Sequence, residues 1–91
     1  MKVSQTPAFK RDFKRLKKKK FDMSKLLSVL ELIQDRDKET LRTRYRDHAL
    51  KGNWKGYREL HIEADWLLIY KIEEKIVTLV LTRTGSHDDL F

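Results

Sequence analysis

The last third of the chain constrains the fold most, because it contains three runs rich in β-branched, aromatic and leucyl side chains. The runs cover residues 57–62, 65–72 and 76–83, and breaks of two and three residues separate them. Short runs of this kind, joined by short breaks, are typical of an antiparallel meander. We therefore predict a small antiparallel sheet in this part of the chain.

The first third of the chain predicts two helices. Thr6 and Pro7 form a favourable helix start, because Thr caps the first turn and the N–H that Pro lacks would be unpaired there. Asp22 is placed to cap a second helix. Apolar residues recur with helical spacing in both segments: Phe9, Phe13 and Leu16 in the first, and Met23, Leu26, Leu27, Leu30 and Ile33 in the second. We expect an antiparallel hairpin of helices that packs on the sheet.

The other segments are shorter: a first strand at residues 2–5, a polar connector with one helical turn at 34–47, and a loop at 48–56. Ser86, with Asp89 three residues later, resembles a capping box, which places His87 at the first position of a final helical turn. A chain of 91 residues is expected to form one domain. We predict a single α+β domain, residues 1–91, with an N-terminal helix hairpin packed on a small antiparallel sheet and a short C-terminal helical turn.

Positive charge is concentrated near the amino terminus. The net charge is +7, and residues 1–25 hold ten Lys or Arg against two Asp or Glu, so the other 66 residues carry −1. A basic face of this kind favours polyanions and makes their binding depend on salt. A solvated helix face that only keeps the protein soluble explains the charge equally well.

Composition excludes several classes of protein. The chain has no cysteine, so it has neither a disulfide framework nor a thiolate metal site. No apolar run approaches the ~20 residues of a membrane span, and residues 1–7 lack the apolar core of a secretion signal. We expect a cytoplasmic protein that does not contact a membrane.

Five polar side chains near the predicted sheet are candidates for catalysis: His48, His61, Asp65, Arg83 and His87. This set suits the cleavage of a phosphodiester without a metal ion, in which one group takes the proton of a ribose 2′-hydroxyl and another protonates the leaving 5′-oxygen. Histidine titrates near neutral pH and performs either transfer. Arginine stays charged, fits phosphate oxygens in a bidentate fork and stabilises the charge that develops on them.

Each of these residues also has a structural interpretation. The three histidines fit a loop, a half-exposed strand position and a helix surface, and Arg83 fits an ion pair with Asp88 or Asp89. His61 and Asp65 have the i, i+4 spacing of metal ligands on a helix, but the predicted turn divides them, so we predict no metal site. The aromatic residues Trp54, Tyr57 and Trp66 fit core positions. Trp66 also fits a brace for Asp65, and the terminal Phe91 fits base stacking.

Three motifs in the second half of the chain together resemble the YafQ-type branch of the RelE toxin superfamily. They are residues 47–59 (DHALKGNWKGYRE), residues 61–70 (HIEADWLLIY) and residues 83–87 (RTGSH), followed by Leu90 and Phe91. The chain length and the preceding helix hairpin also fit, so the resemblance spans the whole chain. One position departs from the family pattern: Ala64 stands where a proline usually precedes the Asp-Trp pair.

The resemblance implies a bacterial type II toxin that cleaves messenger RNA in the decoding site of the ribosome. The active-site positions of the family fall on His48, His61, Asp65, His87 and Phe91, with Arg83 in the RTGSH motif and Trp66 in the Asp-Trp pair. It also implies a small antitoxin partner, often with a ribbon-helix-helix half, through which DNA is contacted only indirectly.

On this basis we hypothesise a ribosome-dependent endoribonuclease that uses no metal and no other cofactor. The catalytic residues are His48, His61, Asp65, Arg83 and His87. The expected RNA contacts are Lys51, Trp66 and Phe91 near the site and Arg42, Arg44, Arg46, Lys10, Arg11, Lys14, Lys17 and Lys18 on the outer surface. An extended segment would present Arg42, Arg44 and Arg46 on one side. Two other functions stay open: a toxin on the same scaffold that poisons gyrase without cutting RNA, and an RNA-binding module without catalysis.

Overall fold

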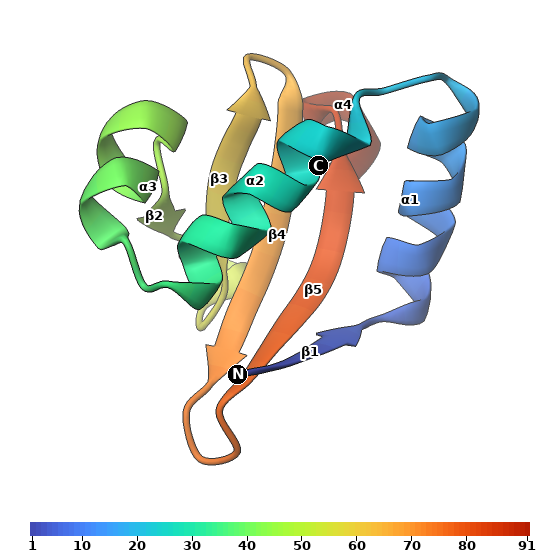
Figure 1. Ribbon diagram of the computed structural model, residues 1–91. Coiled ribbons are helices and arrows are strands. Elements are labelled where there is room, and N and C mark those ends of the chain that lie inside the picture. Colours follow the sequence, from blue (N-terminus) through green and yellow to red (C-terminus); the bar gives the residue numbers. More distant parts are fainter.

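The computed structural model describes residues 1–91 and places helices on both faces of a single sheet (Figure 1). In chain order the elements are β1 (Lys2–Gln5), α1 (Pro7–Lys18), α2 (Met23–Gln34), α3 (Lys38–Tyr45), β2 (His48–Ala49), the 3₁₀ turn η1 (Gly52–Trp54), β3 (Arg58–Glu63), β4 (Trp66–Glu73), β5 (Thr78–Gly85) and α4 (His87–Leu90). The predicted α+β class is confirmed, as are the first strand and the final helical turn.

The sheet has the strand order β1-β5-β4-β3-β2. Strands β3, β4 and β5 form the predicted antiparallel meander. The sheet as a whole is mixed rather than antiparallel, because β1 pairs in parallel with β5. The segment that contains His48 is not a loop: His48 and Ala49 form the short edge strand β2, which pairs with β3.

Helices α1 and α2 begin where the sequence predicts. The Thr6 hydroxyl accepts a hydrogen bond from the Phe9 N–H, and the Asp22 carboxylate accepts one from the Ser24 N–H. Both helices lie on the near face of the sheet in Figure 1, with α1 beside β5 and α2 across β3 and β4. Their inner faces pack with strand residues into the main core.

One prediction for the apolar face of α2 is wrong. Leu27 is 60% exposed, and Val29 is fully buried in its place. The buried residues of α2 are Leu26, Val29 and Ile33, which follow the three- and four-residue spacing of one helix face. Leu27 is rotated by about 100° from Leu26, and this rotation turns it toward solvent.

The segment before β2 was predicted as a connector with one helical turn, and it contains the two-turn helix α3. The Asp37 side chain caps it, and Arg46 ends it in a left-handed backbone conformation with φ of 55°. The segment is therefore not extended, and the condition under which Arg42, Arg44 and Arg46 would lie on one side is not met. Residues two apart on a helix are rotated by about 200°, so Arg42 and Arg44 point in different directions.

The far face of the sheet has a smaller apolar cluster. Leu67 and Ile69 of β4 pack there with Leu90 of α4, and Leu50, Trp54 and Tyr57 lie against them. Helix α4 is drawn fainter in Figure 1 because it lies behind the sheet. This face carries the candidate site. None of the helices combines the length and the apolar character needed to cross a membrane.

Candidate active site

Two of the three histidines share one buried carboxylate. His48 lies opposite Glu59 in the β2–β3 pair, and His61 follows Glu59 by two residues, so it points to the same face. The Nε2 atoms of His48 and His61 lie 3.6 and 3.8 Å from Oε1 of Glu59, which is only 4% exposed. No role for Glu59 was predicted from the sequence. The available signal was the alternation of β3, which places Glu59 on the same face as His61.

The third histidine is held at the start of α4. The backbone N–H of His87 donates a hydrogen bond of 3.1 Å to Oδ1 of Asp65, which lies in the turn between β3 and β4. The predicted capping box is also present, with reciprocal bonds between Ser86 and Asp89. The bond from the Ser86 backbone N–H is the main reason that the pKa of Asp89 is lowered. The Asp65 side chain therefore fixes the position of His87 by binding the backbone N–H of His87.

Strand register brings these groups to one end of the sheet. Leu67 of β4 pairs with His61 on one side and with Gly85 on the other. Adjacent strands are about 4.8 Å apart, so the backbones of His61 and Gly85 are separated by roughly 10 Å. His87 follows Gly85 by two residues, and Asp65 bridges to it. His61, Asp65 and His87 thus lie near one end of the sheet, and His48 adjoins His61 through Glu59. Arg83 lies on β5 opposite Ile69, two residues further along β4 than Leu67.

Aromatic rings border the site. The ring of Phe91 lies 5.3 Å from that of His87 and 6.0 Å from that of Trp54, centroid to centroid. Trp54 in turn contacts Tyr57 edge to face at 5.5 Å. Phe91 is 55% exposed, so one part of its ring docks and the rest faces solvent. This arrangement offers a stacking surface beside an imidazole.

Arg83 pairs with an unexpected partner. The sequence interpretation of Arg83 as the partner of Asp88 or Asp89 is wrong. Arg83 donates from Nε and Nη2 to the two carboxylate oxygens of Asp12 in α1, at 2.7 and 3.1 Å. The hydrogen bond to Asp12 is also the main reason that the pKa of Arg83 is raised. No local signal connects two residues that are 71 positions apart.

Trp66 does not lie on an RNA-facing surface, and that prediction is wrong. It is 2% exposed, its indole N–H donates to Oγ1 of Thr84 at 3.0 Å, and Phe21 contacts its ring edge to face. Trp66 belongs to the core beneath α1 and α2. It braces the end of β4 that follows Asp65.

The predicted basic contacts differ in how free their charges are. Lys10, Arg11, Lys14, Lys17, Lys18 and Lys51 are exposed and take part in no ion pair. Arg42 is paired with Glu39 at 3.1 Å, and the guanidinium of Arg44 lies over the ring of Tyr45 at 5.8 Å. Helix α1 therefore offers more uncompensated positive charge than α3.

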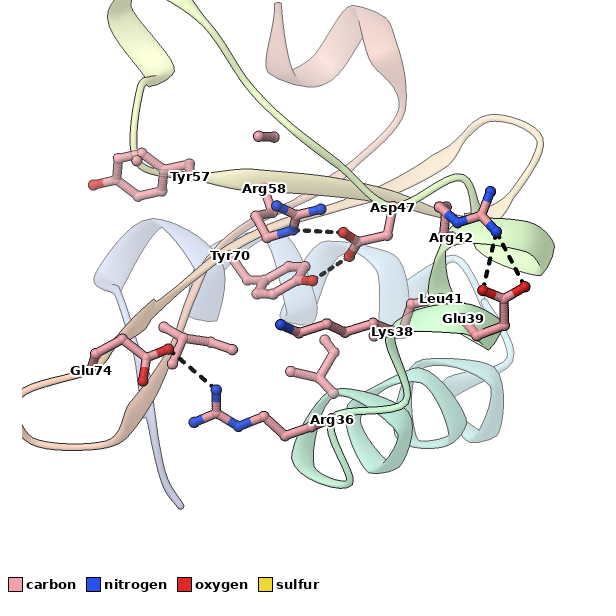
Figure 2. Close-up of a pocket in the computed structure, with 14 residues that line it drawn as sticks. Arg36, Lys38, Glu39, Leu41, Arg42, Asp47, Tyr57, Arg58, Tyr70 and Glu74 are labelled. Carbon is pink, nitrogen blue, oxygen red and sulfur yellow. Dashed lines mark hydrogen bonds and ion pairs between the residues drawn. The ribbon is translucent and has the colours of Figure 1, made fainter.

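A pocket of about 590 Å³ lies between α3 and the sheet, and no histidine lines it (Figure 2). At its edge Asp47 accepts hydrogen bonds from Nε of Arg58, at 2.7 Å, and from the Tyr70 hydroxyl. Burial, followed by the contact with Asp47, raises the pKa of Tyr70. Since Asp47 immediately precedes His48, this network anchors the start of β2. The catalytic candidates do not line this pocket.

The side chains around the histidines include few possible metal ligands. No group of three or more His, Asp or Glu side chains is arranged to hold a metal ion. The contacts of His48 and His61 are those of imidazoles beside a carboxylate, an arrangement suited to proton transfer.

Comparison with known proteins places the chain in one family. All of residues 1–91 match the family model for the bacterial toxin of type II toxin–antitoxin system, YafQ. The mRNA interferase toxin YafQ of Escherichia coli K12 is 42% identical over 89 residues, which are 98% of this chain and 94% of the relative.

Solved structures agree in fold. A chain in the crystal structure of the E. coli DinJ–YafQ complex has a TM-score of 0.84 at 38% identity, covering 98% of this chain and 96% of that one. A metal-bound toxin from Helicobacter pylori has a TM-score of 0.89 at 37% identity, covering 100% and 99%. The resemblance of the sequence motifs is thereby confirmed. The chain belongs to the YafQ family of bacterial toxins of type II toxin–antitoxin systems, whose E. coli member is an mRNA interferase, that is, an endoribonuclease.

Proposed function

We propose that this toxin is an endoribonuclease that cleaves messenger RNA on the ribosome and so inhibits translation. Family membership supports the activity. The observation that carries the site assignment is that His48 and His61 face one buried carboxylate, Glu59, while Asp65 holds His87 on the same side of the sheet. Arg83 lies on the neighbouring strand β5. These groups are the ones that metal-free phosphodiester cleavage requires.

The proposed reaction is an in-line attack within the RNA strand. One imidazole takes the proton of the 2′-hydroxyl, and the 2′-oxygen then forms a bond to the adjacent phosphorus. The bond from phosphorus to the 5′-oxygen breaks, and a second, protonated group gives its proton to that oxygen. The products are a 2′,3′-cyclic phosphate and a 5′-hydroxyl, and Arg83 stabilises the charge on the phosphoryl oxygens.

The geometry suggests how the roles divide. His87 is one proton-transfer group, because α4 holds it at an exposed position. His48 and His61 supply the other, because Glu59 between them attracts and orients the imidazole that carries the positive charge. Asp65 positions His87, and Phe91 stacks on a base.

RNA and ribosome binding are assigned to the exposed basic side chains. Those of α1 carry no ion-pair partner, so they are free to neutralise phosphates. Lys51 stands at the entry to η1, near the face that carries the histidines.

The test is mRNA cleavage during translation in a purified system. We expect His87→Ala and Arg83→Ala each to slow cleavage by about 10²–10⁴-fold. The matched control is Glu74→Gln, which removes an exposed ion pair with Arg36 away from the site. Cleavage of naked RNA at the same rate would contradict ribosome dependence. A toxin that loses activity after treatment with EDTA, with the chelator removed before assay, would contradict metal-free cleavage.

A cognate antitoxin is part of the proposal. The E. coli relative is found in complex with DinJ, and we expect this toxin to bind a small protein inhibitor, of ribbon-helix-helix type, that covers the basic face or the site. Co-expression with the reading frame next to the toxin gene should restore growth. Growth arrest with intact mRNA and blocked replication would instead favour a gyrase poison.

A further inference from the structure

We propose that Asp12 is a positioning residue for Arg83, and that Arg15 couples this pair to the helix that carries His87. The inference rests on the function of Arg83 proposed above. It assigns a role in catalysis to α1 that is separate from the binding role of its basic outer face.

Asp12 occupies a gap at the edge of the sheet. Strand β1 ends at Gln5, which pairs with Leu81, so the last residues of β5 pair with β4 on one side and have no strand on the other. The N–H of Thr84 donates to Oδ2 of Asp12 at 3.1 Å. A carboxylate that is 2% exposed thus takes the place of a strand partner and meets β5 next to Arg83.

The bond to Asp12 leaves the outer edge of the Arg83 guanidinium free. A guanidinium has five N–H groups, and Asp12 takes one from Nε and one from Nη2. The Nη1 atom and the second N–H of Nη2 remain, and they form the other fork, which fits two phosphate oxygens. The Arg83 side chain is 29% exposed, so a ligand can reach this fork. Asp12 therefore fixes the direction in which the fork points.

Arg15 extends the network to α4. Its Nη1 lies 3.2 Å from Oδ1 of Asp12, and its Nη2 lies 3.3 Å from Oδ2 of Asp89 in the capping box. A Cβ atom at Gly85 would lie 3.0 Å from Nη2 of Arg15 and 3.1 Å from Oδ2 of Asp89. A side chain at this position would have to push these groups aside by a few tenths of an ångström. The chain Arg83–Asp12–Arg15–Asp89 thus joins the guanidinium to the element that holds His87.

A merely structural role, in which Asp12 only fastens α1 to β5, makes a different prediction. If Asp12 only holds α1 against β5, its substitution slows cleavage whether or not Arg83 is present. A positioning residue that acts through Arg83 has nothing left to position once Arg83 is gone. A double-mutant cycle separates the two.

The experiment measures mRNA cleavage on programmed ribosomes with toxin in excess, so that low rates are resolved. Asp12→Asn is compared in the parent and in the Arg83→Ala background, with Glu74→Gln as the control ion pair. We expect Asp12→Asn to slow cleavage about 10- to 100-fold in the parent, with ribosome affinity unchanged, and to have no further effect in the Arg83→Ala background. An equal loss in both backgrounds, or no loss in the parent, overturns the proposal.

Two controls keep the outcome decisive. If Arg83→Ala cleaves like the parent, the function proposed for Arg83 fails, which is distinct from a failure of Asp12 alone. Thermal unfolding checks that each variant is folded at the assay temperature.

If Asp12→Asn is unfolded, Arg15→Gln replaces it in the experiment. That change removes the contact with α4 and leaves Asp12 bonded to Arg83. Slower cleavage at unchanged ribosome affinity then supports the network, and unchanged cleavage overturns it.

Discussion

The carboxylate of Asp65 holds the backbone N–H of His87 at 3.1 Å and so joins the β3–β4 turn to the first residue of α4. The Asp65 carboxylate thus contacts the main chain of His87 and not its imidazole. This relation favours a positioning role for Asp65, and the role has a direct test.

Asp65→Ala is expected to slow mRNA cleavage about tenfold or more, because His87 loses the acceptor that fixes it and a misplaced catalytic group reacts more slowly. Asp65→Asn retains an oxygen in the same position, so it should keep most of the activity. Single-turnover cleavage of ribosome-bound mRNA gives both rates. Equal losses in the two variants would show that the negative charge of Asp65, not its hydrogen bond, matters.

Glu59→Gln is expected to lower the cleavage rate by about 10- to 100-fold at neutral pH, since it removes the negative charge that faces both His48 and His61 while keeping the side-chain volume. Rates between pH 5 and 9 on programmed ribosomes measure this. Glu63→Gln is the matched control, because Glu63 lies on the same strand but pairs with Lys25 of α2. A parent-like rate for Glu59→Gln would remove Glu59 from the site.

Neutralising three exposed lysines of α1 is expected to weaken ribosome binding. Lys14, Lys17 and Lys18 replaced by Gln remove three phosphate contacts, so the slope of log affinity against log salt should fall by about 2. Binding to ribosomes at several salt concentrations measures the slope. The same three lysines replaced by Arg keep the charge and should keep the slope. An unchanged slope for the Gln variant would identify this helix face as a solubilising surface.

Acid is expected to loosen the start of α4. The pKa of Asp89 lies below its ordinary value of 3.8, mainly because of the bond from the Ser86 N–H. A lowered folded-state pKa means that the carboxylate stabilises the fold above pH 3.8, and that this contribution is lost as the pH falls through the folded-state pKa. Backbone NMR signals of Ser86 and His87 between pH 2 and 6 report the transition. Asp89→Asn should abolish that transition, and its persistence would assign it to another group.

Trp66→Phe is expected to lower the free energy of unfolding by about 1–3 kcal/mol, because it removes buried volume and the indole bond to Thr84. Urea denaturation measures the loss. Ribosome affinity should stay at the parent level, since Trp66 lies in the core. Weaker ribosome binding by a fully folded Trp66→Phe protein would restore the RNA-contact interpretation.

Local signals account for the parts of the fold that were predicted correctly. The caps at Thr6, Asp22 and Ser86 act within one helical turn, so sequence spacing is enough to find them. Pairing partners across the sheet are not local. Helix α3 was predicted only as a single turn because Leu41 is its one buried residue, so no apolar periodicity marks its length.

The alternation of apolar and polar residues does not identify the inner face of a strand that is covered on both sides. The first five residues of β4, from Trp66 to Tyr70, are all buried, so polarity does not reveal which of them face the helices and which face the histidines. The polarity of its neighbours therefore does not reveal that Trp66 faces the main core. For a related reason, Leu27 and not Val29 was predicted to be buried. The face that α2 buries depends on how the helix crosses the sheet.

The sequence by itself determined the types of reactive group, the elements that carry them and the family, because residue identity, capping and motif spacing are properties of neighbouring positions. Only the tertiary structure decided that Asp12 holds Arg83, that Glu59 stands between two imidazoles, and that Asp65 meets the main chain of His87. These contacts join segments up to 71 residues apart, and they arise when strand register and helix packing bury one polar group against another.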